Sequence, residues 1–312
     1  MLDALSKGFF HTLAASKTLK RMASRYGMRS STSFGRRFIA GEAIEEALAA
    51  VRDVEARGMT QTLDQLGESV TSAEEAARAT SGYLRILDAI EKAGVGRNVS
   101  VKLTQLGLDI DRATCIDNLR RILDRAQAAQ FFVRIDMENS PYTDVTLDIV
   151  ETAWSLGYKN VGTVLQSCLK RSERDAERLI AAGIRVRLVK GAYKEPAAVA
   201  FQSKSDVDAA FVRMTQALLA RGDYPAIATH DPRMIEATKA FSAQQGIAKD
   251  RFEFQMLFGI RRDLQAQLVA EGYRMRIYVP FGTEWYPYFM RRLGEWPANV
   301  YWVAKGIISD RG

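Results

Sequence analysis

The chain has 312 residues, of which 47% are hydrophobic and 26% charged, so it is long enough to bury a complete core. Its two cysteines, Cys115 and Cys168, and its two histidines show no metal-ligand spacing, which argues against a zinc site and a disulfide scaffold, and no metal is expected. No apolar run reaches the roughly 18 residues of a transmembrane helix.

The net charge of +7 is concentrated near the N-terminus. Residues 1–41 carry eight basic residues against one acid, which leaves 36 basic and 36 acidic residues in 42–312. Apolar residues recur there at helical spacing, at Leu2, Leu5, Phe9 and Leu13. We expect a basic amphipathic helical extension that packs on the body, contacts an acidic membrane, or serves as an organellar transit peptide. The neutral remainder has no basic stripe, which argues against a nucleic acid partner.

From about residue 43 onward, short β-rich segments alternate with helical patterns. The expected strands are 59–63, 99–103, 131–136, 160–165, 184–189, 224–228, 251–255 and 275–279. The clearest helices are 72–92, 112–129, 172–182 and 206–221, with Ser172 and Asp206 as expected N-caps. Eight such alternations without a shift in composition predict one (β/α)8 barrel over 42–312. The alternative is an open doubly wound sheet, but Gly94 and Gly96 precede a strand and lack the third glycine of a dinucleotide fingerprint.

The C-terminal helical segment 288–295 reads YFMRRLGE. Helical spacing places Tyr288, Arg291, Arg292 and Glu295 on one face. Two adjacent guanidinium groups repel each other unless an anion lies between them, and their planar forks suit a carboxylate or phosphate. The alternative is a solvated basic face held by an ion pair between Arg291 and Glu295.

Polar residues also occur where almost every expected strand ends, which is where barrel enzymes place their chemistry. In chain order they are Glu68, Lys102, Asp136, Gln166, Arg187, Lys190, Tyr193, Thr229, His230, Gln255 and Tyr278. Unpaired charge inside a barrel is costly, so Lys102, Asp136 and Arg187 need each other or a ligand. A structural ion-pair network that closes the barrel is the alternative.

Six motifs give the chain a resemblance to the proline dehydrogenase family over about 41–299. They are VKL at 101–103, RID at 134–136, RLVKGAY at 187–193, ATH at 228–230, FEFQ at 252–255 and YxxRRxxE at 288–295. The resemblance implies a distorted (β/α)8 TIM barrel that holds FAD, rather than FMN, and oxidises L-proline to Δ1-pyrroline-5-carboxylate. It also implies electron transfer to a membrane quinone, and the chain is similar in length to the monofunctional members.

The resemblance further implies roles for individual residues. Arg291, Arg292 and Lys102 correspond to a clamp for the proline carboxylate, and Arg187 to a cation beside flavin N5 that Asp136 pairs with to gate the site. The implied substrate-binding residues are Lys102, Tyr193, Leu257, Tyr278, Arg291 and Arg292. The implied catalytic residues are Lys102, Asp136, Arg187 and Tyr278, and the implied cofactor contacts are Gln166, Arg187, Lys190, Thr229 and His230. Glu68 and Glu295 correspond to carboxylates that orient the two arginines.

Other functions remain open from the sequence. Phe289 and Met290 depart from the aliphatic residues that are frequent in the family motif, so hydroxyproline or another cyclic imino acid is an alternative substrate. A Schiff-base aldolase using Lys102 or Lys190, and a non-catalytic barrel that docks on membranes, are more remote alternatives. The expected location is the cytoplasm, with peripheral contact at the inner face of the membrane as an addition.

Overall fold

The computed structural model describes residue 28 and residues 33–295, which form a closed barrel of eight parallel strands. The strands follow one another around the barrel in chain order, and β8 closes it by pairing with β1. Their bounds are β1 Thr60–Gln65, β2 Asn98–Val101, β3 Phe132–Ile135, β4 Val161–Gln166, β5 Arg185–Val189, β6 Ala226–Ala228, β7 Glu253–Leu257 and β8 Met275–Phe281.

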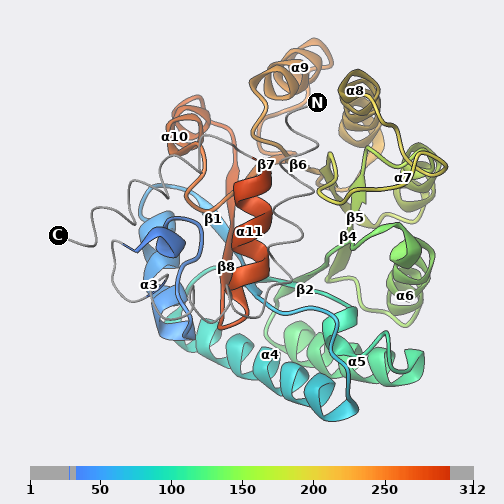
Figure 1. Ribbon diagram of the computed structural model, residues 1–312. Coiled ribbons are helices and arrows are strands. Elements are labelled where there is room, and N and C mark those ends of the chain that lie inside the picture. The colour runs from blue at the N-terminus through green and yellow to red at the C-terminus, as the bar shows by residue number, and fades with distance from the viewer. Residues whose placement is uncertain (1–27, 29–32, 296–312) are drawn as a thin grey trace.

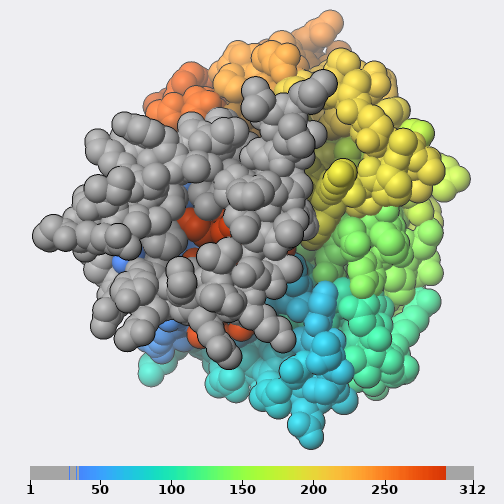
Figure 2. Space-filling view, viewed as in Figure 1, coloured from blue at the N-terminus to red at the C-terminus, as the bar shows by residue number. Residues whose placement is uncertain are grey.

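Helices surround the strands, as Figure 1 shows. The α-helices of the described residues are α3 Ile44–Glu55, α4 Ala73–Ala93, α5 Arg112–Ala128, α6 Thr143–Ser155, α7 Ser172–Ala181, α8 Lys204–Arg221, α9 Pro232–Gln244, α10 Arg262–Ala270 and α11 Trp285–Glu295. Three short 3-10 turns lie at Phe34–Arg37, Thr104–Leu106 and Ser140–Tyr142. In the space-filling view, the cyan to yellow segments from α4 to α8 form the lower and right-hand rim of this face (Figure 2). None of the described helices is long and apolar enough to cross a bilayer.

The eight expected strands are all present, which confirms the (β/α)8 barrel and excludes the open sheet. Two N-cap predictions were wrong. Ser172 is the first residue of α7, and its hydroxyl donates instead to the carbonyl of Gln166 at 2.6 Å, closing the turn after β4. Helix α8 begins before Asp206, because the hydroxyl of Ser203 accepts a hydrogen bond from the Asp206 amide. Ser203 is therefore the N-cap, three residues before the expected one.

Strand register decides which side chains meet inside the barrel. Asp64 pairs with Ser100, and Ser100 with Arg134, so these three side chains point to the same side of the sheet. Lys102 and Asp136 lie two residues further along β2 and β3 and share that side. The barrel interior therefore collects the polar residues, while the alternate positions belong to the hydrophobic core under the helices.

Helix α11 lies across the mouth of the barrel in front of the strands (Figure 1). A second hydrophobic cluster fixes it there, and it includes Trp285, which is 1% exposed. The ring of Phe289 is 5.8 Å from that of Trp285 and 6.1 Å from that of Phe38. The Trp285 indole N–H also donates to Glu42 at 2.9 Å. We call residues 33–42 the bracing segment, because it holds α11 against the barrel.

The bracing segment overlaps the expected N-terminal extension 1–41. Phe38 and Ile39 are buried, and the Ala40 amide donates to the carbonyl of Pro280 on β8 at 2.9 Å. The end of the extension is thus packed on the body. The amphipathic helices expected before it fall on residues 1–27 and 29–32, which lie outside the described residues.

Candidate active site

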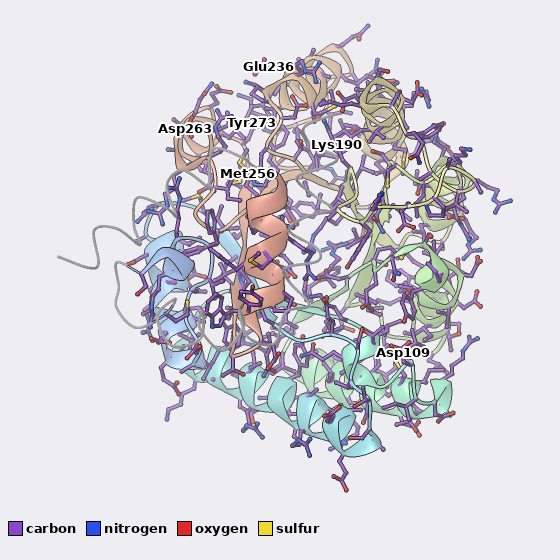
Figure 3. All side chains as sticks on the ribbon, in the orientation of Figure 1. Asp109, Lys190, Glu236, Met256, Asp263 and Tyr273 are labelled. Atoms are coloured by element: carbon purple, nitrogen blue, oxygen red, sulfur yellow. The ribbon has the colours of Figure 1, made fainter. Side chains whose placement is uncertain are left out.

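A cavity of about 470 Å³ opens at the carboxyl ends of the strands, under α11. It brings together residues that are separated by as many as 190 positions in the chain, between Lys102 and Arg292. Twelve of the expected site residues line it: Lys102, Asp136, Gln166, Arg187, Lys190, Tyr193, Thr229, His230, Leu257, Tyr278, Arg291 and Arg292. In Figure 3, Lys190 and Met256, two of the lining residues, are labelled near the upper end of α11 in this view.

A charged network occupies the inner wall of the cavity. Asp136 accepts hydrogen bonds from Arg187 at 2.9 Å and from the Tyr278 hydroxyl at 2.8 Å. The Lys102 ammonium is 3.5 Å from Asp136 and 3.5 Å from the Tyr278 oxygen. It lies closest to Asp64, at 3.0 Å and 3.2 Å from the two carboxylate oxygens. Two cations and two carboxylates therefore balance within the network.

The network also fixes protonation states. Burial opposes the charge on Lys102, but the carboxylates of Asp64 and Asp136 outweigh it and hold the pKa of Lys102 well above its ordinary value. Burial likewise opposes ionisation of Asp136, yet Lys102 and Arg187 hold its pKa below the ordinary value. The site therefore presents a protonated lysine and an ionised Asp136. Burial raises the pKa of Tyr193, which also lines the cavity, to about 12, so its hydroxyl stays neutral.

Asp64 is a residue of the charged network that sequence reasoning missed. Strand β1 was expected to end at residue 63, whereas it continues through Gln65. The signal was present, because Thr62 and Asp64 alternate with apolar Leu63, and continuing that alternation by one residue points Asp64 into the barrel.

The two arginines of α11 enter the cavity from above the strands. Arg291 donates to Glu68 at 2.7 Å and 3.3 Å, which is the pairing that the resemblance implied. Arg292 is 8% exposed, and its guanidinium lies 5.1 Å from the centre of the Tyr288 ring. The side chain of Glu295 lies outside the described residues.

A second cavity, of about 620 Å³, adjoins the first at the end of β1. Glu68 lines only this second cavity, whereas Lys102, Tyr288 and Arg291 line both. The ion pair between Arg291 and Glu68 therefore stands on the boundary between the two spaces.

The far wall of the main cavity comes from β4, β5 and β6. Gln166 is 2% exposed, and its side-chain oxygen has no hydrogen-bond partner among the described residues, while its amide donates to the carbonyl of Glu138 at 2.8 Å. Gly191 has φ of +111°, and a Cβ there would lie 2.4 Å from the Cys168 sulfur, so only glycine lets the loop pass this close. His230 accepts a hydrogen bond from the Leu257 amide at 3.0 Å.

A cluster of three cations and two carboxylates lies at the outer end of this wall. Lys190 donates to Asp208 at 2.5 Å and to Asp231 at 2.8 Å, and Lys204 and Arg233 contact the same two carboxylates. The two acids were not expected from the sequence. Asp231 could have been found as an N-cap, because Pro232 follows it at the first position of α9, whereas Asp208 lies within α8 and carries no local signal.

Comparison with known proteins agrees with this geometry. The proline dehydrogenase family profile matches residues 47–305. Proline dehydrogenase 2 of Bacillus subtilis is 41% identical over 303 residues, which are 97% of this chain and 99% of that protein. The proline dehydrogenase of Deinococcus radiodurans is 40% identical over 313 residues, which are 99% of this chain and 100% of that one.

A solved structure shares the fold. It is the proline utilization A (PutA) protein of Bdellovibrio bacteriovorus inactivated by N-propargylglycine, which superposes with a TM-score of 0.78 at 28% identity. The match covers 83% of this chain and 32% of that one. With its closed barrel, its convergent lysine and arginine pair and its nearly full-length relatives, the chain belongs to the proline dehydrogenase family.

Proposed function

We propose that the main cavity holds FAD and L-proline together and that the chain oxidises L-proline to Δ1-pyrroline-5-carboxylate, with a membrane quinone as electron acceptor. The observation that carries this proposal is the convergence of Lys102, Arg291 and Arg292 on one cavity whose opposite wall holds a buried amide oxygen without a partner. The first feature suits an amino acid carboxylate, and the second suits a planar ring with an N–H.

The three cations serve as the clamp for the proline carboxylate, and Tyr278, Leu257 and Tyr193 enclose the ring. The fixed forks of Arg291 and Arg292 orient the carboxylate, which positions the ring carbon that loses hydride. The inactivator named for the Bdellovibrio relative, N-propargylglycine, carries a secondary amine and a carboxylate, as proline does.

The remaining wall fits a flavin. Its apolar lining includes Val164, Val189 and Met256, and the orphaned oxygen of Gln166 would accept a hydrogen bond from a ring N–H. Thr229 and His230 complete this wall. When bound, the flavin would supply the hydride acceptor, which no amino acid side chain provides.

Arg187 provides a fixed positive charge at this wall. Its guanidinium is held by Asp136 and lies 5.3 Å from the centre of the Tyr278 ring, so it has little freedom to move. A fixed cation there stabilises negative charge that develops on the acceptor. Replacing it in Arg187→Ala should therefore lower the reduction potential of the bound flavin, and potentiometry that gives an unchanged or raised potential would contradict this role.

The cluster around Lys190 favours FAD over FMN. Its three cations exceed its two carboxylates by one charge, and it lies at the N-terminal ends of α8 and α9, where backbone N–H groups favour anions. This is where a dinucleotide would place its diphosphate. Mass spectrometry of the cofactor released from the purified protein should identify FAD.

The Schiff-base alternative is disfavoured at Lys102. A nucleophilic lysine must be neutral, whereas Asp64 and Asp136 hold Lys102 protonated. Hydroxyproline is a poorer fit than proline, because the Tyr278 hydroxyl is already bonded to Asp136 and its ring crowds the space that a ring hydroxyl would need.

The central test is anaerobic reduction of the purified protein. Adding L-proline should bleach the visible absorbance of the oxidised flavin, and adding a soluble quinone should restore it. A flavin-free protein, or a flavin that proline leaves oxidised, would overturn the proposal. Borohydride trapping of a substrate on lysine would instead support the aldolase.

A further inference from the structure

Asp64 is the one member of the charged network that does not line the cavity. Its exposure is 0%, and it lies behind Lys102, at 3.0 Å and 3.2 Å from the ammonium nitrogen. Isolating a carboxylate from water costs several kcal/mol as an order of magnitude, and an apolar pair of similar volume is often at least as stable. Stability alone therefore does not explain this pair.

The geometry around Lys102 shows what the ammonium would do without Asp64. The next carboxylate oxygen is Oδ2 of Asp136, at 3.5 Å, and that same oxygen already accepts the Tyr278 hydroxyl at 2.8 Å. An ammonium released by Asp64 would move toward this oxygen and compete with Tyr278. Asp136 would then neutralise Lys102, and the bond between Asp136 and Arg187 would be shared with a second cation.

From this arrangement we infer that Asp64 is a positioning residue for substrate binding, which draws the Lys102 ammonium away from Asp136 and leaves it aimed at the substrate carboxylate. The inference rests on the proposed function, in which Lys102 is part of the proline clamp. It predicts a change in carboxylate affinity that is opposite in sign to the one expected from charge alone. If only the charge count mattered, removing a negative charge beside the clamp would tighten carboxylate binding, whereas loss of position weakens it.

The test compares Asp64→Asn with Lys102→Met and with the double variant. We expect Asp64→Asn to raise the KM for proline by about tenfold, in line with the loss of one charged hydrogen bond, and to change kcat by less than about threefold. Calorimetry with cyclopentanecarboxylate, which has the carboxylate but no amine to oxidise, should give a matching loss of affinity. When Lys102 is already methionine, adding Asp64→Asn should leave KM unchanged, because Asp64 acts only through the lysine.

The melting temperature provides a second readout, in which removing the charge of Asp64 should be favourable once Lys102 has been replaced. Lys102→Met leaves a buried carboxylate without its cation, so adding Asp64→Asn to it should raise the melting temperature. Glu253→Gln is the matched control: Glu253 is 3% exposed, is paired with Arg276 at 2.7 Å in the same barrel, and does not line the cavity. It should lower stability without changing the KM for proline.

The outcomes separate the inference from the proposed function. If Lys102→Met leaves KM unchanged, the proposed role of Lys102 is wrong and the inference falls with it. If Lys102→Met raises KM but Asp64→Asn leaves it unchanged or lowers it, the inference alone is overturned. Should Asp64→Asn fail to fold, Asp64→Glu carries the test, since it keeps the charge, displaces it by one methylene, and should still raise KM.

Discussion

Each arginine of α11 should contribute separately to proline binding. Arg291 is balanced by Glu68 at 2.7 Å, and Arg292 lies over the Tyr288 ring. Replacing either in Arg291→Met or Arg292→Met removes one fork, and a charged hydrogen bond is worth about 1.5–3 kcal/mol, or tens to hundreds of fold in kcat/KM. Steady-state kinetics with flavin content measured alongside would check this. Arg213→Met, which breaks a surface pair with Glu173, is the control, and near wild-type efficiency in both α11 variants would refute the clamp.

His230 should make the protein sensitive to acid. Burial lowers its pKa to about 4, and the charges of Arg292 and Arg261 act in the same direction. The unfolded histidine titrates near its ordinary value of 6.5, so between that pH and about 4 the unfolded chain binds a proton that the folded one rejects. The stability contributed by neutral His230 is therefore complete above pH 6.5 and is lost as the pH falls toward 4, by at most about 3 kcal/mol.

Urea unfolding at a series of pH values would measure this loss. His230→Gln keeps an acceptor at the reach of Nε2, the atom that accepts from the Leu257 amide, but has no titrating group, so its stability should depend less on pH over this window than that of the wild type. Asp231 does not affect this comparison, because its pKa is lowered from 3.8. The stability that its charge contributes is therefore lost only at a pH below this window. Parallel pH curves for the two proteins would show that His230 is not the sensor.

Among the residues that the barrel strands contribute, those at or near the strand ends could be predicted from the sequence. Lys102, Asp136 and Arg187 are polar where the pattern is otherwise apolar, and parallel strands bring their carboxyl ends to one edge. Asp64 was missed because the choice between strand and loop at residue 64 depends on pairing with Ser100 on the neighbouring strand, which is a tertiary contact. Asp208 was missed for a similar reason, since its partner Lys190 comes from a different element.

At the scale of elements, the regular barrel could be predicted from the sequence, but the placement of α11 over its mouth could not. Strand runs and helix periodicity recur locally, so the eight β/α units appear in the sequence. The placement of α11 over the mouth depends instead on contacts between distant segments, such as Trp285 with Glu42 and Phe289 with Phe38. Trp285 and Phe289 are therefore anchors for this helix, and their side chains do not line the main cavity.

The bracing segment crosses the barrel at Gly259, and this contact can be tested. A Cβ on Gly259 would lie 1.7 Å from the Arg37 carbonyl oxygen, and its φ is +76°. Gly259→Ala should therefore displace the segment, cost about 1–3 kcal/mol of stability, and raise the KM for proline because α11 shifts with it. Gly246→Ala is the matched control, with φ of +64° but nothing within 4 Å of the added Cβ. Equal losses in the two variants, with KM unchanged in both, would show that backbone strain alone is responsible.

At the scale of the whole molecule, the chain divides into a neutral catalytic barrel and a basic N-terminal part whose last residues belong to the barrel's packing. Phe38 and Ile39 are buried in the cluster that holds α11, so a truncation at residue 41 removes part of the site's support. Residues 1–27 carry five basic residues and one acid, and they are the part that we propose contacts an acidic membrane near the quinone.

Two truncations should therefore behave differently. Deleting residues 1–27 should leave flavin content and proline oxidation by a soluble dye intact, while binding to acidic liposomes falls, because about 1 kcal/mol per basic residue near the surface is lost. Deleting residues 1–41 should also raise the KM for proline and lower the melting temperature, since it removes Phe38, Ile39 and the Ala40 bond to β8. Liposome binding that survives the shorter deletion would exclude residues 1–27 as the lipid contact. An insoluble or flavin-free product of that same deletion would instead mean that these residues cover apolar surface on the barrel, because their loss would then expose it to water.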